Sequence, residues 1–178
     1  KNIYGNSIDK SLLWSYSFRN FTQQLARQFS LDGVDVTIPT GCVGGCDAFA
    51  YALNEIRLGK SECAIVGAVE APITPLVVTA FGRIQATSTR ACPPEEASCP
   101  FDNRRDGFVL GEGGGMLVLE SEQSAIERGA TIYAEIKGAG SNNNCFHMTA
   151  IPPTGEHIEE SCKLALKPTL LIFPCGAR

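Results

Sequence analysis

Short apolar segments alternate with segments of helical periodicity along most of this chain. Cys63–Val69 is a short, continuous apolar run, which is typical of a strand buried on both faces. The apolar stripe in Ala48–Ile56 predicts a helix before it, and Thr74–Ile84 is predicted to form a helix after it. Because strands that alternate with helices build layered sheets, we predict an α/β fold with much parallel sheet.

The same criteria place the remaining elements. The further helices are expected at 11–29, Ser121–Arg128 and Gly155–Leu166, and the further strands at Val34–Ile38, Met116–Glu120 and Ile132–Gly138. Thr87–Asn103 is predicted to be loop, because prolines interrupt it. No linker or internal repeat divides the chain, so we expect one domain.

Composition and charge argue against several classes of protein. The apolar content of 44% is ample for a core, so a disordered chain is not expected. The net charge of −4 speaks against nucleic-acid binding, which needs a clustered basic face. The sequence contains neither a membrane-spanning apolar run nor a signal-peptide profile.

The eight cysteines admit three interpretations. A disulfide framework is one, but several cysteines lie inside apolar segments of a chain that is not small. A structural zinc site is another, but no CxxC pair occurs and there are only two histidines. Mostly free thiols in a reducing compartment are the favoured interpretation, with no metal.

The stretch TGCVGGCDAFAYALNEI, Thr40–Ile56, places Cys42 where a predicted strand turns into a helix. A helix N-terminus carries partial positive charge and unpaired N–H groups, so a thiol there ionises more easily. Gly41, Gly44 and Gly45 allow a tight turn and the approach of a substrate. This pattern is typical of a nucleophile in acyl transfer. Spacing alone equally permits a buried cysteine in a turn, and that interpretation stays open.

Three separated segments carry a resemblance to a known family. They are TGCVGGCDAFAYALNEIRLGKSECAIVGAVEAPITP, PFDNRRDGFVLGEGGGMLVLE and IYAEIKGAGSNNNCFHMTAIPPTGE. In sequence and order they resemble the β-ketoacyl synthases, the condensing enzymes of fatty-acid and polyketide assembly. The likeness covers about residues 35–166.

The resemblance implies a thiolase-like layered α-β-α fold built of two related halves. This chain is expected to hold it incompletely, as a partial β-ketoacyl synthase domain over 1–178. About 1–120 would be a portion of the N-terminal half and about 121–166 the start of the C-terminal half. Residues 167–178 diverge from the family, and its NAHG-like and GH-like catalytic histidine motifs are absent from this sequence.

The chemistry implied by the resemblance centres on Cys42. An acyl chain delivered by the phosphopantetheine arm of an acyl carrier protein is held on this cysteine as a thioester. A malonyl unit then loses CO2, and its carbanion attacks the thioester; the Cys42 backbone N–H supplies half of the oxyanion hole. No cofactor of its own is expected. The implied partners are the carrier protein and a second ketosynthase subunit in a homodimer or heterodimer, in the cytoplasm.

The resemblance suggests further residues near the substrate. Thr149 matches a threonine near the pantetheine tunnel, and His147 either lines the site structurally or positions substrate. His157 is expected on a solvent-facing helix surface.

Other features of the matching segments are given structural roles. Gly44 and Gly45 are expected beside the nucleophile, Arg105 and Asp106 as a buried ion pair that holds a loop, and Glu112 as an acceptor for a backbone N–H near the site. Cys46 is expected to pack in the interior. The glycines of GEGGG are predicted to form a turn, since the context of a nucleotide-binding loop is missing.

Four functions remain open on the sequence. The leading one is an elongating ketosynthase, with polyketide slightly favoured over fatty-acid synthesis. The second is a non-catalytic, chain-length-factor-like partner subunit, a class that typically lacks the cysteine. The third is a fragment without activity of its own. The fourth is a cysteine hydrolase, which needs a histidine base near Cys42.

Overall fold

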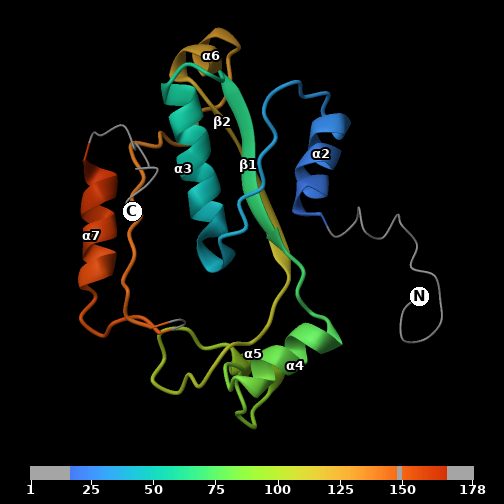
Figure 1. Cartoon of the computed structure of the whole chain (residues 1–178), viewed down its shortest axis with the longest axis vertical. Coiled ribbons are helices and arrows are strands. Elements are labelled where there is room, and N and C mark those ends of the chain that lie inside the picture. The colour runs from blue at the N-terminus through green and yellow to red at the C-terminus, as the bar shows by residue number, and fades with distance from the viewer. Residues whose placement is uncertain (1–16, 148–149, 168–178) are drawn as a thin grey trace, which may run out of the picture. The chain divides into compact units, whose positions relative to one another are not determined.

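The computed structural model describes residues 17–147 and 150–167. Helices and strands are mixed along the chain (Figure 1). The chain forms two compact units. Unit 1 contains the described residues up to Val66 and from Leu117 onward, and unit 2 is Gly67–Met116.

Two strands, β1 (Cys63–Glu70) and β2 (Gly113–Glu120), form a two-stranded sheet (Figure 1). The Ser121 N–H donates to the Glu62 carbonyl at 3.1 Å, so the end of β2 meets the start of β1. At the opposite end, a Cβ built on Gly114 would lie 3.4 Å from the Val69 side chain. The pair is therefore antiparallel, and the prediction of a mainly parallel sheet is wrong for the described residues.

Two predicted strands are absent from the described part of the chain. Val34–Ile38 and Ile132–Gly138 are irregular segments, and Val34 is 81% exposed. β-Branched alternation favours a pleated, half-buried surface, but it forms a strand only beside a partner. Neither segment has one among residues 17–147 and 150–167.

Helix α3 (Gly44–Arg57) confirms the helix predicted from the apolar stripe in Ala48–Ile56. Its side chains Ala52 and Leu53 are 6% and 8% exposed. The other buried apolar residues of the described chain are Ala50, Val66 and Ala125. The core of unit 1 therefore centres on α3. β1 contributes only Val66 to it, so the prediction of a strand buried on both faces is wrong.

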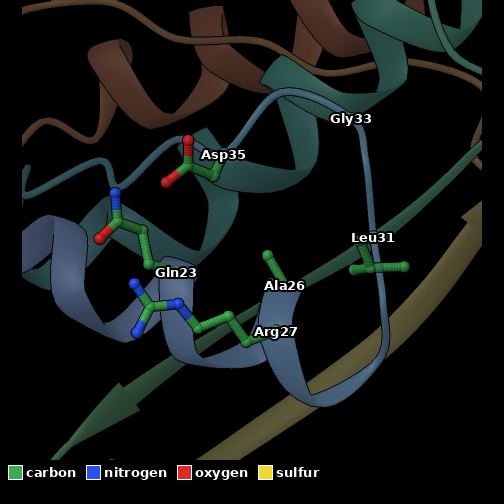
Figure 2. A pocket seen from close by; sticks show the side chains of 6 residues that line it. All are labelled: Gln23, Ala26, Arg27, Leu31, Gly33 and Asp35. Atoms are coloured by element: carbon green, nitrogen blue, oxygen red, sulfur yellow. The ribbon is translucent and has the colours of Figure 1, made fainter.

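Helix α2 (Phe18–Gln28) follows the predicted pattern, but its aromatic face is open. Phe18 and Phe21 are 61% and 52% exposed. Polar contacts join α2 to the following segment: Arg19 forms an ion pair with Asp35 at 3.2 Å, and the Thr37 hydroxyl donates to the Phe18 carbonyl at 3.0 Å. Figure 2 shows the shallow hollow between them, which is lined by Gln23, Ala26, Arg27, Leu31, Gly33 and Asp35.

Unit 2 carries helices α4 (Pro75–Arg83) and α5 (Pro94–Ala97). Thr74 caps α4 by accepting a hydrogen bond from the Val77 N–H at 3.3 Å, as its position before a proline favours. The short α5 lies within the stretch predicted to be loop. Phe81 of α4 and Phe108 meet edge to face, with ring centroids 6.1 Å apart. This contact ties α4 to the segment that leads into β2.

The last helices, α6 (Glu122–Glu127) and α7 (Glu156–Leu166), lie in unit 1 and confirm the predicted positions. The segment before α7 passes very close to it: a Cβ built on Gly140 would lie 2.2 Å from the Ser161 carbonyl. Only glycine fits at this approach. Over the described residues, no helix has the length and apolar character to cross a membrane.

Candidate active site

Cys42 lies in the 3-10 turn η1 (Gly41–Val43), which leads directly into α3. The turn depends on Gly41, whose φ of +70° is the left-handed conformation that glycine adopts without steric cost. The Thr40 hydroxyl donates to the Asp47 carboxylate at 2.6 Å, which joins the start of the turn to the first turn of the helix. Cys42 itself is exposed. The interpretation of Cys42 as a buried cysteine is therefore wrong.

The helix N-terminus beside Cys42 is formed by glycines. Gly44 and Gly45 are the first two residues of α3, and Val43 at the N-cap contributes no side-chain hydrogen bond. A Cβ built on Gly44 would lie 3.2 Å from the Ile38 carbonyl, which is closer than such contacts usually are. The preceding segment can therefore cross close to the start of the helix.

The elbow, defined as residues 40–47, combines features that suit a nucleophile. Its thiol is exposed, and the helix behind it offers backbone N–H groups and partial positive charge. Such donors can stabilise an oxyanion that develops next to the sulfur. Cys46, one helical turn further on, is also exposed, so its predicted packing in the interior is wrong.

In unit 2, the predicted buried ion pair between Arg105 and Asp106 is wrong. Both residues are exposed, and each contacts another partner. Asp106 accepts hydrogen bonds from the Ser88 hydroxyl at 2.5 Å and the Thr89 N–H at 3.0 Å, and these bonds, Ser88 first, lower the pKa of the Asp106 carboxyl. Arg105 donates to the Asp102 carbonyl at 2.8 Å.

The pairing of the segment around Asp106 with residues 86–88 was not predicted from the sequence. The Phe108 N–H donates to the Ala86 carbonyl at 2.7 Å, and the Ser88 N–H donates to the Phe108 carbonyl at 2.9 Å. A Cβ on Gly107 would lie 2.6 Å from the Ser88 nitrogen, so only glycine allows the two backbones to meet. The Asp-Gly dipeptide was the available signal for a turn here.

Glu112 accepts a hydrogen bond from the Ile73 N–H at 3.0 Å, within unit 2. The bond joins the residue before β2 to the loop before α4. The glycines that follow it do not form the predicted turn, because β2 already begins at Gly113. They extend the strand instead.

The histidine region lies in unit 1. His147 is exposed, and its Nδ1 accepts from the Ala150 N–H at 3.2 Å. Thr149 lies outside the described residues. His157 is half-buried on α7 rather than solvent-facing, and its carbonyl accepts from the Asn142 side chain at 2.9 Å. Over the described chain, no group of three His, Cys, Asp or Glu side chains is arranged to hold a metal ion.

Comparison with known proteins assigns this chain to a family. Residues 19–125, more than half of the chain, match the family described as "Beta-ketoacyl synthase, N-terminal domain". The chain is 42% identical over 144 residues to the tetracenomycin polyketide synthase ketoacyl synthase alpha subunit of Streptomyces glaucescens. That alignment covers 81% of this chain and 34% of the relative. The chain thus spans about a third of the length of that curated protein.

Solved structures agree with this match. One is a type II PKS acyl-carrier protein in complex with its ketosynthase bound to the hexaketide, with a TM-score of 0.88 and 38% identity, covering 93% of this chain and 41% of the other. Another is the ishigamide ketosynthase/chain length factor, with a TM-score of 0.78 and 32% identity, covering 89% and 38%. Cys42 and the glycines beside it lie inside the region matched by the family.

Proposed function

The chain belongs to the β-ketoacyl synthase family, and we propose that it carries the acyl-binding nucleophile, Cys42, of a ketosynthase in polyketide biosynthesis. The observation that carries the proposal is the exposed thiol at the head of α3, within the region that the family matches. Gly41 sets the turn that presents it, through its φ of +70°.

The first half-reaction is acyl transfer to Cys42. The thiolate attacks the carbonyl carbon of an acyl thioester on the phosphopantetheine arm of a carrier protein. The new carbon–sulfur bond forms as the bond to the arm's sulfur breaks, and the released thiolate takes up a proton. Backbone N–H groups at the start of α3, with that of Cys42, stabilise the oxyanion of the tetrahedral intermediate.

The second half-reaction is decarboxylative condensation with a malonyl unit. It needs donors aimed at the malonyl thioester oxygen, where enolate charge develops. In the family these are histidines of two motifs that the 178-residue sequence does not contain, and we give their role to neither His147 nor His157. We therefore expect this polypeptide to accept an acyl group but not to elongate it.

The partners follow from the same proposal. An acyl carrier protein delivers the substrate, and a related ketosynthase subunit completes a homodimer or heterodimer. The solved relatives described as a carrier protein with its ketosynthase and as a ketosynthase/chain length factor support both expectations. Thr149 and His147 are proposed to line the path of the phosphopantetheine arm. A complete thiolase-like layered fold and a cytoplasmic location belong to the same proposal.

Two other functions fit less well. A chain-length-factor-like subunit does not require a presented thiol, whereas Cys42 is exposed at a helix N-terminus. A cysteine hydrolase needs a histidine base beside the sulfur. Transfer that stops at the acyl-enzyme distinguishes the proposal from hydrolysis, which returns free acid.

The test uses the purified chain and a carrier protein loaded with a short acyl group. Intact and peptide mass spectrometry should find one acyl group on Cys42, which Cys42→Ser removes. Cys46→Ser is the matched control, because Cys46 is also exposed and lies one helical turn away. Equal acylation of Cys46, or free acid without an acyl-enzyme, would overturn the proposal. Elongated product after addition of malonyl-loaded carrier would contradict the expected lack of condensation.

A further inference from the structure

Arg90 of unit 2 is the centre of a cluster that includes two cysteines. Its Nε donates to the Cys92 sulfur at 3.4 Å, and its Nη1 donates to the Cys99 sulfur at 3.4 Å. The same guanidinium donates to the Arg104 carbonyl at 3.2 Å and to the Glu96 carbonyl. One cation therefore holds two thiols and two backbone carbonyls of the loop formed by residues 88–106.

The two sulfurs are close in space although they are separated in sequence. Each sulfur lies 3.4 Å from a nitrogen of the same guanidinium. The distance between the two sulfurs is therefore at most the sum of these two contacts and the distance between the two nitrogens. The one-turn helix α5 lies between Cys92 and Cys99 in the sequence. Both cysteines are half-buried, and both are free thiols.

We propose that Cys92 and Cys99 form a reversible dithiol–disulfide pair, with Arg90 as the positioning residue. The guanidinium holds both thiols beside one side chain, and the thiolate of either is the form that attacks a disulfide. The hydrogen bond to the Cys92 sulfur is the largest cause of the raised pKa of the Arg90 guanidinium, and the bond to the Cys99 sulfur raises it as well.

The oxidant is a small disulfide of the glutathione type. The thiolate of one cysteine attacks it, forms a mixed disulfide and releases one small thiolate. The thiolate of the other cysteine then attacks the mixed disulfide and expels the second small thiolate. The two cysteines lose two electrons in total and the oxidant gains them, while the proton of each thiol passes to a released thiolate or to solvent.

The disulfide changes the contacts of Arg90. Once the sulfurs are joined, they can no longer both accept from a guanidinium that lies between them. The side chain must move, and its bonds to the Glu96 and Arg104 carbonyls are then lost or rearranged. Oxidation therefore loosens the loop from 88 to 106, which ends at the Asp106 carboxylate that holds Ser88 and Thr89.

The proposal can be tested on the whole 178-residue chain. The protein is equilibrated with reduced and oxidised glutathione at a series of ratios, free thiols are alkylated, and tryptic peptides are analysed by mass. Cleavage after Arg90 and Arg104 places both cysteines in one peptide, 91–104, so the internal disulfide is read as a loss of two hydrogens. Cys42 and Cys46 serve as a reference pair of exposed thiols.

We expect the 91–104 disulfide to form at a lower share of oxidised glutathione than any link between Cys42 and Cys46, and dithiothreitol to reverse it. A matched variant, Arg90→Lys, keeps the charge but cannot bind both sulfurs in a fork. It should shift the ratio of reduced to oxidised glutathione at which half of the pair is oxidised, and it should slow the formation of the disulfide. Only mixed disulfides at Cys92 and Cys99, or a pair no easier to close than Cys42 and Cys46, would overturn the proposal. Closure unchanged in Arg90→Lys would overturn the role of Arg90.

Discussion

The two regions that present cysteines are built in different ways. The elbow at Cys42 is set by backbone geometry, by a left-handed glycine and a helix N-terminus, and α3 behind it carries the buried stripe of unit 1. The loop from 88 to 106 contains no buried residue, and side-chain hydrogen bonds of Arg90, Asp102 and Asp106 hold it together. The elbow therefore depends on a left-handed glycine and on the packing of α3. The loop depends instead on hydrogen bonds of charged side chains and on whether its two thiols are reduced.

The largest expected effect comes from removing the packing behind the elbow. Leu53 is 8% exposed, and Leu53→Ala should lower the free energy of unfolding by roughly 2–5 kcal/mol, since a cavity adds to the lost burial. Urea unfolding followed by circular dichroism measures it. Val34→Ala, at a side chain that is 81% exposed, is the control and should change stability by about 0.5 kcal/mol or less. Equal losses in both variants would show that α3 does not support a core.

A smaller effect is expected at the turn itself. Gly41→Ala puts a Cβ on a residue with φ of +70°, which should cost roughly 1–2 kcal/mol and slow acylation of Cys42. The same unfolding assay and the acyl-transfer assay measure these changes. Gly33→Ala is the matched control, because a Cβ built on Gly33 has no atom within 4 Å and Gly33 has no positive φ. Wild-type stability and acylation in Gly41→Ala would contradict the role of the left-handed turn.

A local effect is expected in the loop. Arg90→Met removes the bonds to both sulfurs and both carbonyls, so amides between 88 and 106 should exchange with deuterium several-fold faster. Amides of α3 should keep their exchange rates, because the hydrogen bonds of the Arg90 side chain are made to Cys92, Glu96, Cys99 and Arg104. Faster exchange in α3 as well would break the distinction between the two regions.

The smallest effect is a titration within the loop. The pKa of the Asp102 carboxyl is lowered from 3.8 to about 2. The main cause is the hydrogen bond from the Arg104 guanidinium, and the second is the hydrogen bond from the Arg104 N–H. A lowered pKa means that this carboxylate stabilises the folded loop above its unfolded pKa, near 3.8. The contribution is lost as the pH falls toward 2. Carbon NMR of the side-chain carboxyl should show a midpoint near 2, and Arg104→Ala should move it upward. A midpoint near 3.8 in the unchanged protein would contradict this contact.

The sequence was informative where local periodicity decides structure. The stripe of α3, the proline start of α4 and the position of α7 follow from spacing and capping residues that act within one or two turns. Cys42, the proposed nucleophile, was also singled out from the sequence, because it lies between glycines that a sharp turn requires.

Predictions that depend on distant partners failed. Val34–Ile38 has the pattern of a strand, but no strand lies beside it among the described residues. Arg105 and Asp106 are neighbours in sequence, yet Asp106 binds Ser88, which is 18 positions away. The meeting of Cys92 and Cys99 on Arg90 has no local signal, since it depends on the conformation of the residues between them.

The two-stranded sheet has a practical consequence. Over the described residues it consists of β1 and β2 alone, so each strand has one side with no neighbour. Leu117 and Val118 of β2 are 60% and 57% exposed, so apolar side chains are also open on the two faces beside that edge. Such an edge recruits other extended chains. We therefore expect the protein to self-associate as its concentration rises, and a lysine substituted on this edge should reduce that association.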